Sequence, residues 1–442
     1  MVTQPQNPRV LIFSQRNIFK KALFRCPHYE FEDTIYKIDA AEILAPEADP
    51  SNPRHRIARR AAFHVPVALN SGIPPIELKT RYDLFLAICG APGDLLMVNS
   101  VSNWRDVCKS SVCLIDEIWL TQMHSYRYFL RLLQKFDVVL LYYSQSVKPL
   151  SDRIGRKVVF MPPGVDAIAF CPYPERPQRV VDVYSIGRRS ETTHQSLLNM
   201  VAEHGLFYLY DSIKGGDSIN TKQHRALLAN VSKRSRYYIV NPGLIDRPEI
   251  RGSQAEAGNR YFEGAAAGAI MIGERPNNEE FGKLFDWPDA VVHLPYDSSN
   301  IQAIIKDLDE QPERQEKIRR TNVVGALTKH DWVYRWETVL RTVGLEPMPG
   351  LHQRKERLGK LAEAVSTVEP CATATATIPP SPTPTATATF TPTPTATATA
   401  TASFTPPPTS TPTSTPTATP TPPAPPTSLS TSSTKPGKID LQ

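Results

Sequence analysis

Residues 256–272 read EAGNRYFEGAAAGAIMI, and this stretch decides the fold of the second half of the chain. Its segment 260–267 predicts a helix rich in small residues, and the apolar run 269–272 after it predicts a short buried strand. A helix that leads directly into a buried strand is typical of α/β domains, in which helices cover both faces of a mainly parallel sheet.

The same alternation extends in both directions from this stretch. In the second half we expect further strands at 180–186, 206–210, 237–240 and 291–294, with helices at 191–203, 221–232, 301–308, 312–327 and 331–341. In the first half we expect strands at 9–14, 82–88, 95–98, 111–115, 136–142 and 158–161, with an amphipathic helix at 121–135. The predicted fold class is α/β, with two Rossmann-like doubly wound domains.

Prolines between Phe170 and Pro177 predict a stiff connection, and we place the domain boundary there. The first domain is expected at residues 1–172 and the second at 178–345, followed by a basic helix or linker at 346–369. Because ligands of open α/β sheets bind at the carboxyl ends of the strands, the cleft between the two domains is the expected site.

Residues 370–442 have a different composition from the rest of the chain. Between Cys371 and Ser433 they are almost only Thr, Pro, Ala and Ser. Such a segment cannot bury enough apolar surface to offset the entropy of ordering. We expect a disordered low-complexity tail that acts as a partly polyproline-II spacer and carries no chemistry.

Charge and motif patterns exclude several classes of protein. The 50 Lys and Arg against 44 Asp and Glu leave a net charge of +6, too small a surplus to argue for a nucleic-acid partner. No apolar run is long enough for a membrane span, and no signal-peptide core stands near the start, so we expect a cytoplasmic protein. Without a His/Cys cluster, a GxGxxG loop or a P-loop, we expect no metal and no cofactor.

The strand expected at 180–186 is followed by Gly187, Arg188 and Arg189. A glycine there lets the backbone approach a ligand closely, and two guanidinium groups suit a diphosphate. The start of the next helix, near Ser190, would add N–H donors for the same anion. A turn with two solvated arginines is the alternative interpretation.

Four carboxylates are further candidates. Glu256 and Glu263 flank a glycine-containing loop, and a carboxylate at a helix start can accept hydrogen bonds from the vicinal hydroxyls of a ribose. A helix cap is the alternative for Glu263. Asp116 and Glu117 follow the strand expected at 111–115, so they should face the cleft, where a general base would lie. Surface or helix-capping acids are the alternative for this pair.

In combination, these segments resemble the GT-B glycosyltransferases, in particular the family-4-like group (glycosyl transferases group 1) and its CgeB-like branch. The matching segments are Pro163-Gly-Val-Asp166 with Phe170 and Pro172, then Gly187-Arg188, then Glu256 to Glu263 with Gly-Ala-Ala-Ala-Gly268, and finally His330-Asp-Trp332 with Arg335. The resemblance spans roughly residues 10–340.

The resemblance implies a metal-independent, retaining hexosyltransferase that moves a sugar from a nucleotide-sugar to a glycan, lipid or small-molecule acceptor. It implies that Glu263 holds the donor ribose and that Arg188, with Arg189 beside it, neutralises the diphosphate. It also implies that Glu256 lies near the donor sugar and that Asn259 and Arg260 line the same loop.

Three departures from the family pattern keep other functions open. Six residues separate the two glutamates where the family has seven, the lysine expected after Gly-Arg is missing, and Gln15-Arg-Asn17 replaces the glycine pair after the first strand. A non-catalytic nucleotide- or glycan-binding module and a GT-B sugar epimerase are the alternatives. The basic stretch 352–360 suggests peripheral contact with a membrane surface, with a solvated helix as its alternative; the sequence specifies no oligomeric state.

Overall fold

The computed structural model of the protein describes residues 7–20, 22–48, 52–53, 57–58, 60–61, 73–212 and 220–367. The described residues up to Thr367 belong to one compact unit. The tail expected at residues 370–442 lies outside the described residues.

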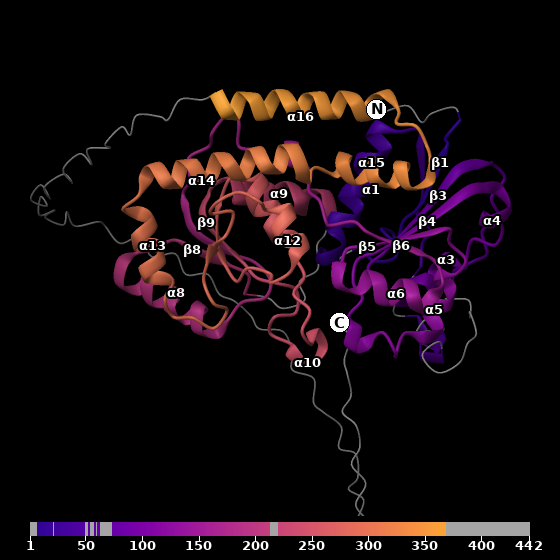
Figure 1. Cartoon of the computed structure of the whole chain (residues 1–442), viewed down its shortest axis with the longest axis horizontal. Helices are drawn as coiled ribbons and strands as arrows, with labels where there is room; N and C mark the ends of the chain where they lie inside the picture. The colour runs from indigo at the N-terminus through magenta and orange to yellow at the C-terminus, as the bar shows by residue number, and fades with distance from the viewer. Residues whose placement is uncertain are drawn as a thin grey trace, which may run out of the picture. The chain divides into compact units, whose positions relative to one another are not determined.

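The first half of the chain forms a parallel six-stranded sheet in the order β2-β1-β3-β4-β5-β6 (Figure 1). Its strands are β1 (Val10–Phe13), β2 (Ala41–Leu44), β3 (Tyr82–Cys89), β4 (Cys108–Ile115), β5 (Val138–Leu141) and β6 (Lys157–Phe160). Its helices are α1 (Cys26–Ile38), α3 (Leu95–Val98), α4 (Trp104–Val107), α5 (Arg127–Leu133) and α6 (Val147–Ile154). We call this sheet and its helices the N-lobe.

The second half forms a parallel five-stranded sheet in the order β11-β10-β9-β7-β8. Its strands are β7 (Val181–Ser185), β8 (Tyr208–Tyr210), β9 (Ser235–Val240), β10 (Ile270–Gly273) and β11 (Val292–His293). Its helices are α8 (Glu191–His204), α9 (Thr221–Lys233), α10 (Pro248–Arg251), α11 (Asn259–Ala266), α12 (Glu279–Leu284), α13 (Ile301–Asp309) and α14 (Pro312–Gly325). We call this half the C-lobe.

Both lobes therefore have the predicted class, a Rossmann-like parallel sheet covered by helices. Every residue of β1, β5 and β10 is buried. When helices cover both faces of a sheet, both sides of each strand are buried, so the strand is a continuous apolar run in the sequence. These strands could therefore be predicted from the sequence.

Two expectations about local structure were wrong. Residues 95–98 form the short helix α3 and not a strand, because four consecutive apolar residues fit a buried turn of helix as well as a buried strand. The helix expected at 121–135 is α-helical only at Arg127–Leu133, and a short 3-10 helix covers Leu120–Gln122. The start of this segment is bound to the C-lobe: the Leu120 amide donates to Gln254 Oε1 at 2.6 Å and the Thr121 hydroxyl donates to the Ile250 carbonyl, so tertiary contacts override the local helical pattern.

The segment in which the chain crosses from the N-lobe to the C-lobe is bound by residues 330–335, which come after α14. Val165 forms a parallel bridge with Asp331, and Arg335 donates two hydrogen bonds to the Pro163 carbonyl, at 2.9 and 3.0 Å. A Cβ at Gly164 would lie 2.6 Å from the Trp332 ring, so only glycine fits there. We call residues 163–166 and 330–335 the crossover clamp. Two of the motifs behind the family resemblance thus meet in this structure.

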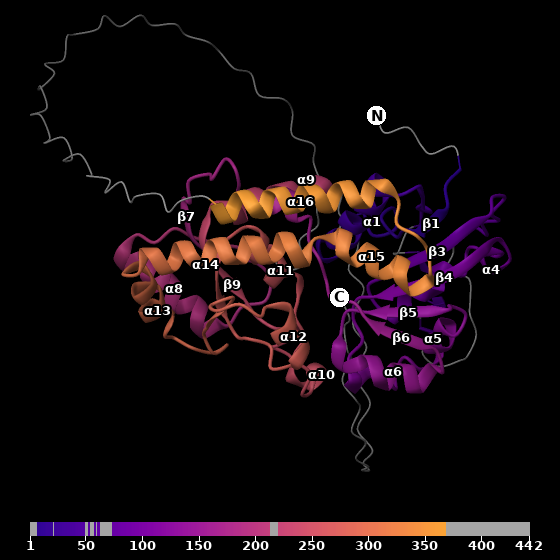
Figure 2. The ribbon, with the colours of Figure 1, turned by 45° about the horizontal axis from the view of Figure 1, so that its top comes forward.

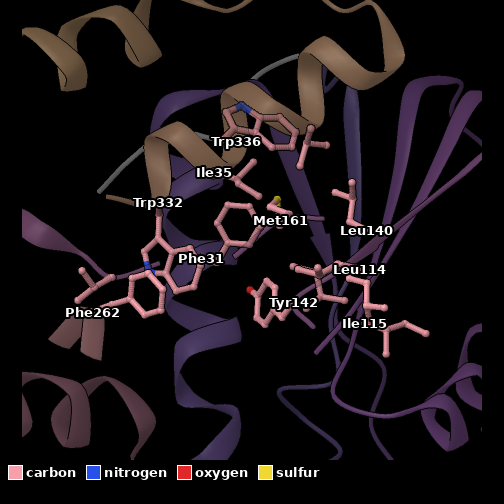
Figure 3. Close-up of a cluster of buried hydrophobic side chains, with 14 of the residues drawn as sticks. Phe31, Ile35, Leu114, Ile115, Leu140, Tyr142, Met161, Phe262, Trp332 and Trp336 are labelled. Carbon is pink, nitrogen blue, oxygen red and sulfur yellow. The ribbon is translucent and has the colours of Figure 1, made fainter. Parts of the chain in front are cut away.

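Helix α15 (Trp332–Val343) carries the second half of the clamp and packs on the N-lobe. Trp332 stacks on Phe31 of α1, with ring centroids 4.9 Å apart, and Phe262 of the C-lobe lies near the same pair (Figure 3). The buried cluster around Trp332 and Trp336 therefore joins residues of both lobes (Figure 3).

The basic stretch forms helix α16 (Pro349–Thr367), which contacts α14 of the C-lobe and α1 of the N-lobe (Figures 1 and 2). Its buried face carries Leu351, Leu358 and Val365. Arg354 pairs with Asp331 at 2.7 Å and with Asp166 at 2.8 Å, so both of these ion-pair partners belong to the crossover clamp. Within the described part of the chain, no helix combines the length and the apolar character that a bilayer crossing needs.

Candidate functional site

The loop after β7 turns at Gly187, whose φ of 89° favours glycine. The turn places Arg188 and Arg189 at the carboxyl end of the C-lobe sheet. Arg188 Nη1 lies 2.9 Å from a carboxylate oxygen of Asp246, and Arg189 Nη1 lies 3.0 Å from Oδ1 of Asp211. Both guanidinium groups predicted for a diphosphate thus have carboxylate partners here. Arg188 is the more exposed, with 45% of its side chain accessible against 23% for Arg189.

The helix start near Ser190 also has its own partners. The Ser190 hydroxyl accepts a hydrogen bond from the Thr193 amide at 3.3 Å and donates to Asp297 at 2.8 Å, so it caps helix α8. A narrow pocket beside this cap is lined by residues from the ends of β7, β9 and β10, among them Ser185, Asn241 and Gly273.

Glu263 lies on α11 and is buried between two arginines. Arg225 Nη1 of α9 bonds its Oε1, and Arg260 Nη1 bonds its Oε2 at 2.5 Å. Burial works to raise the pKa of Glu263, but the positive charges of Arg260 and Arg225 outweigh it and hold the pKa below its ordinary value. The carboxylate is therefore ionised at neutral pH, and each oxygen keeps a further lone pair for a hydroxyl donor.

The start of α11 has no side-chain cap. Gly258 stands at the N-cap position, and among the described residues Asn259 Oδ1 is buried with no hydrogen-bond partner. The first N–H groups of this helix are thus not satisfied by a capping side chain. Asn259, Arg260 and Glu263, which the sequence singled out, lie within this one eight-residue helix.

Glu256 reaches across to the N-lobe. Its carboxylate accepts hydrogen bonds from the backbone amides of Ser144 at 3.2 Å and Gln145 at 3.0 Å, and from the Ser144 hydroxyl. Burial raises its pKa above the ordinary value, although the bonds from Gln145 and Ser144 oppose this. In this structure Glu256 therefore binds the loop after β5 and joins the two lobes.

The residues just before Glu256 form more contacts of the same kind. Gln254 donates to Ser146 Oγ at 3.0 Å, and the Ala255 amide donates to Gln145 Oε1 at 2.9 Å. Together with the Leu120 amide bond to Gln254, these contacts dock the loop 250–256 on the N-lobe. No sequence pattern marked this docking, because it depends on which loops the two lobes bring together.

Asp116 directly follows β4, at the carboxyl end of that strand. Its Oδ2 lies 3.0 Å from Nε2 of His28, a buried residue of α1, while 22% of the Asp116 side chain remains exposed. No sequence pattern marks His28, because a histidine inside an amphipathic helix gives no signal of its own. The pair thus joins a partly exposed carboxylate to a buried imidazole.

Glu117 has a different partner from Asp116: its carboxylate accepts a hydrogen bond from the Trp119 indole N–H. Burial raises its pKa, and the negative charge of Asp116 adds to this effect, whereas the positive charge of Arg188 opposes it. Arg188 of the C-lobe therefore lies within electrostatic reach of Glu117 of the N-lobe.

The structure thus gathers the candidates into three groups. Asn259, Arg260 and Glu263 share α11; Arg188 lies within electrostatic reach of Glu117; and Glu256 is docked on the N-lobe loop. Within the part of the chain that the structure describes, no three His, Cys, Asp or Glu side chains are grouped as metal ligands would be.

Solved structures of other proteins include two that are similar to this chain. The chain is similar to Anabaena Alr3699/HepE in complex with UDP and glucose, at 11% identity over 76% of this chain and 99% of that one, with a TM-score of 0.46. It is also similar to a glycosyltransferase from Rickettsia africae ESF-5, at 11% identity over 77% of this chain and 98% of that one, with a TM-score of 0.41. No curated protein matches the sequence.

A match to a protein-family model is more informative about the site, because the matched segment contains α11. Residues 200–341, which include Glu256 to Glu263 and His330 to Arg335, match the family model described as glycosyl transferase-like.

Proposed function

We propose that the protein transfers a sugar from a nucleotide-diphosphate sugar to an acceptor hydroxyl. The observation that carries the proposal is the arrangement on α11, inside the segment that matches the glycosyl transferase-like model: an ionised, buried Glu263 close to an uncapped helix start. Such a helix start offers N–H donors to a diphosphate, and such a carboxylate offers acceptors to a ribose.

In this proposal the C-lobe binds the donor. Glu263 accepts hydrogen bonds from the ribose hydroxyls, while Asn259, Arg260 and the first amides of α11 face the diphosphate. Arg188, exposed after the Gly187 turn, exchanges its bond to Asp246 for the diphosphate as negative charge develops on the leaving group. The arginines take the charge of the leaving group, so we propose transfer without a metal ion.

The N-lobe binds the acceptor and supplies the base. The acceptor oxygen bonds to the anomeric carbon on the same face that the diphosphate leaves, the bond from that carbon to the diphosphate breaks, and the acceptor proton passes to Asp116. His28 holds the Asp116 carboxylate in place through the 3.0 Å contact. From the family resemblance we propose a hexose donor, retention at the anomeric carbon, a CgeB-like relationship and a cytoplasmic location.

Calorimetric titration of the full chain with uridine and guanosine diphosphates tests the donor site. We expect one of them to bind, and a donor screen with the matching nucleotide-sugars to show slow hydrolysis. If a folded protein binds neither nucleotide, the proposal fails. Proton NMR of the glycoside product distinguishes retention from inversion.

A non-catalytic nucleotide-binding module is the second candidate, because Arg188 and Arg189 are both paired with aspartates in the structure. A module of this kind would bind the nucleotide tightly without hydrolysing or transferring sugar from any donor. The donor screen above separates the two functions.

A further inference from the structure

A chain of buried charges runs from the proposed ribose carboxylate to the N-lobe. Arg225 of α9 is 7% exposed and uses one guanidinium nitrogen for Glu263 and two others for Glu30 of α1, at 2.7 and 3.0 Å. Its guanidinium also lies 4.9 Å from the centroid of the Phe170 ring, which belongs to the segment between the lobes. One arginine thus joins a carboxylate of each lobe.

Glu30 in turn is tied to the crossover clamp. Its Oε1 accepts hydrogen bonds from the Asp166 amide and from the Trp332 indole N–H, both at 2.8 Å. The carboxylate therefore has four donors: two from Arg225 and one from each half of the clamp. A carboxylate held in this way fixes the position of the guanidinium that it binds.

We propose that Arg225 and Glu30 are positioning residues, which make the nucleotide affinity at Glu263 depend on Glu30 of the N-lobe. The inference rests on the proposed function, because it needs Glu263 to bind the donor ribose. Arg225 holds Oε1 of Glu263 at one end, and Glu30 holds Arg225 at the other end. A change at Glu30 then reaches the ribose site through one guanidinium group.

The charges support this arrangement. Glu30 and Glu263 contribute two negative charges, and Arg225 and Arg260 contribute two positive ones, so the buried group is balanced. Removing the charge of Glu30 leaves Arg225 to pair with Glu263 alone and frees it to move toward that carboxylate. We expect it to take up lone pairs that the ribose hydroxyls need.

The test compares Glu30→Gln with Asp166→Asn in the full chain. Asp166 also lies in the clamp, but its side chain pairs with Arg354 and not with Arg225, so this variant disturbs the clamp alone. We expect Glu30→Gln to weaken uridine or guanosine diphosphate binding by roughly three- to thirtyfold, with Asp166→Asn near wild-type affinity.

A third variant, Arg225→Lys, cannot bridge both carboxylates in the same way. Its nucleotide affinity should lie between those of wild type and Glu30→Gln. Wild-type affinity in a folded Glu30→Gln protein would overturn the inference.

A second measurement needs no ligand. Because Glu30 and Glu263 act on the same guanidinium, the loss of melting temperature in Glu30→Gln/Glu263→Gln should differ from the sum of the two single losses. Additive losses would overturn the inference. Coupled losses in a protein that binds no nucleoside diphosphate would instead refute the proposed function and leave the coupling in place.

Discussion

At the scale of single residues, Glu263 decides whether the C-lobe is a nucleotide site. We expect Glu263→Gln to weaken nucleoside diphosphate binding by about ten- to hundredfold, since hydrogen bonds to a charged acceptor contribute about 1.5–3 kcal/mol. Glu279→Gln is the matched control, because Glu279 sits on the exposed surface of α12 and, among the residues that the structure describes, its ion-pair partner is Lys283. Equal affinities for the two variants in calorimetry would contradict the ribose role of Glu263.

In the proposed mechanism, Asp116 of the N-lobe is the general base. Removing a general base costs about 10²–10⁴ in rate, so Asp116→Asn should lower kcat by that factor and leave donor binding almost unchanged. The exposed Asp106 of the same lobe offers the control Asp106→Asn, for which kcat should not change. A small effect of Asp116→Asn in the transfer assay would move the base elsewhere, with Glu117 as the next candidate.

At the scale of helices and strands, the crossover clamp contains two of the motifs, Pro163 to Asp166 and His330 to Arg335. Gly164→Ala puts a methyl group 2.6 Å from the Trp332 ring, and overpacking of this kind costs about 1–3 kcal/mol of the free energy of unfolding. Gly359→Ala on α16 meets no atom within 4 Å and should stabilise the protein by about 0.5–1 kcal/mol, because alanine favours a helix over glycine. Urea unfolding of both variants measures the difference, and a tolerated Gly164→Ala would contradict the packing argument.

Arg354 gives the clamp a dependence on pH. Burial works to raise the pKa of Asp166, but the charge and hydrogen bond of Arg354 outweigh it and lower the pKa. A carboxylate with a lowered folded-state pKa contributes stability above its unfolded pKa of about 4 and loses that contribution as the pH falls through the folded value. Arg354→Met should therefore destabilise the protein by about 3–5 kcal/mol at pH 7, and the difference from wild type should shrink below about pH 4. Arg357→Met, an exposed change on the same helix, is the control.

At the scale of the whole molecule, the sequence predicted what depends on local patterns. The two parallel sheets follow from continuous apolar runs such as β1 and β10, and the candidates on α11 follow from a motif within one helix. Contacts between the lobes could not be predicted in this way. Arg225 lies far from Glu30 in sequence, and Glu256 caps a loop more than a hundred residues before it. Such pairs form only when the two lobes meet.

Helix α16 makes the boundary between the folded unit and the tail testable. Its Leu351, Leu358 and Val365 are buried, and each buried side chain of this size contributes about 1.5–3 kcal/mol. A chain that ends at Glu369 keeps these contacts and should match the full chain in unfolding free energy and in nucleotide affinity. A chain that ends at Glu346 loses them together with the Arg354 pairs, so we expect a large drop in melting temperature. Equal stability of the two truncated chains would show that α16 does not hold the lobes together, while loss of folding in the longer one would place the boundary beyond Glu369.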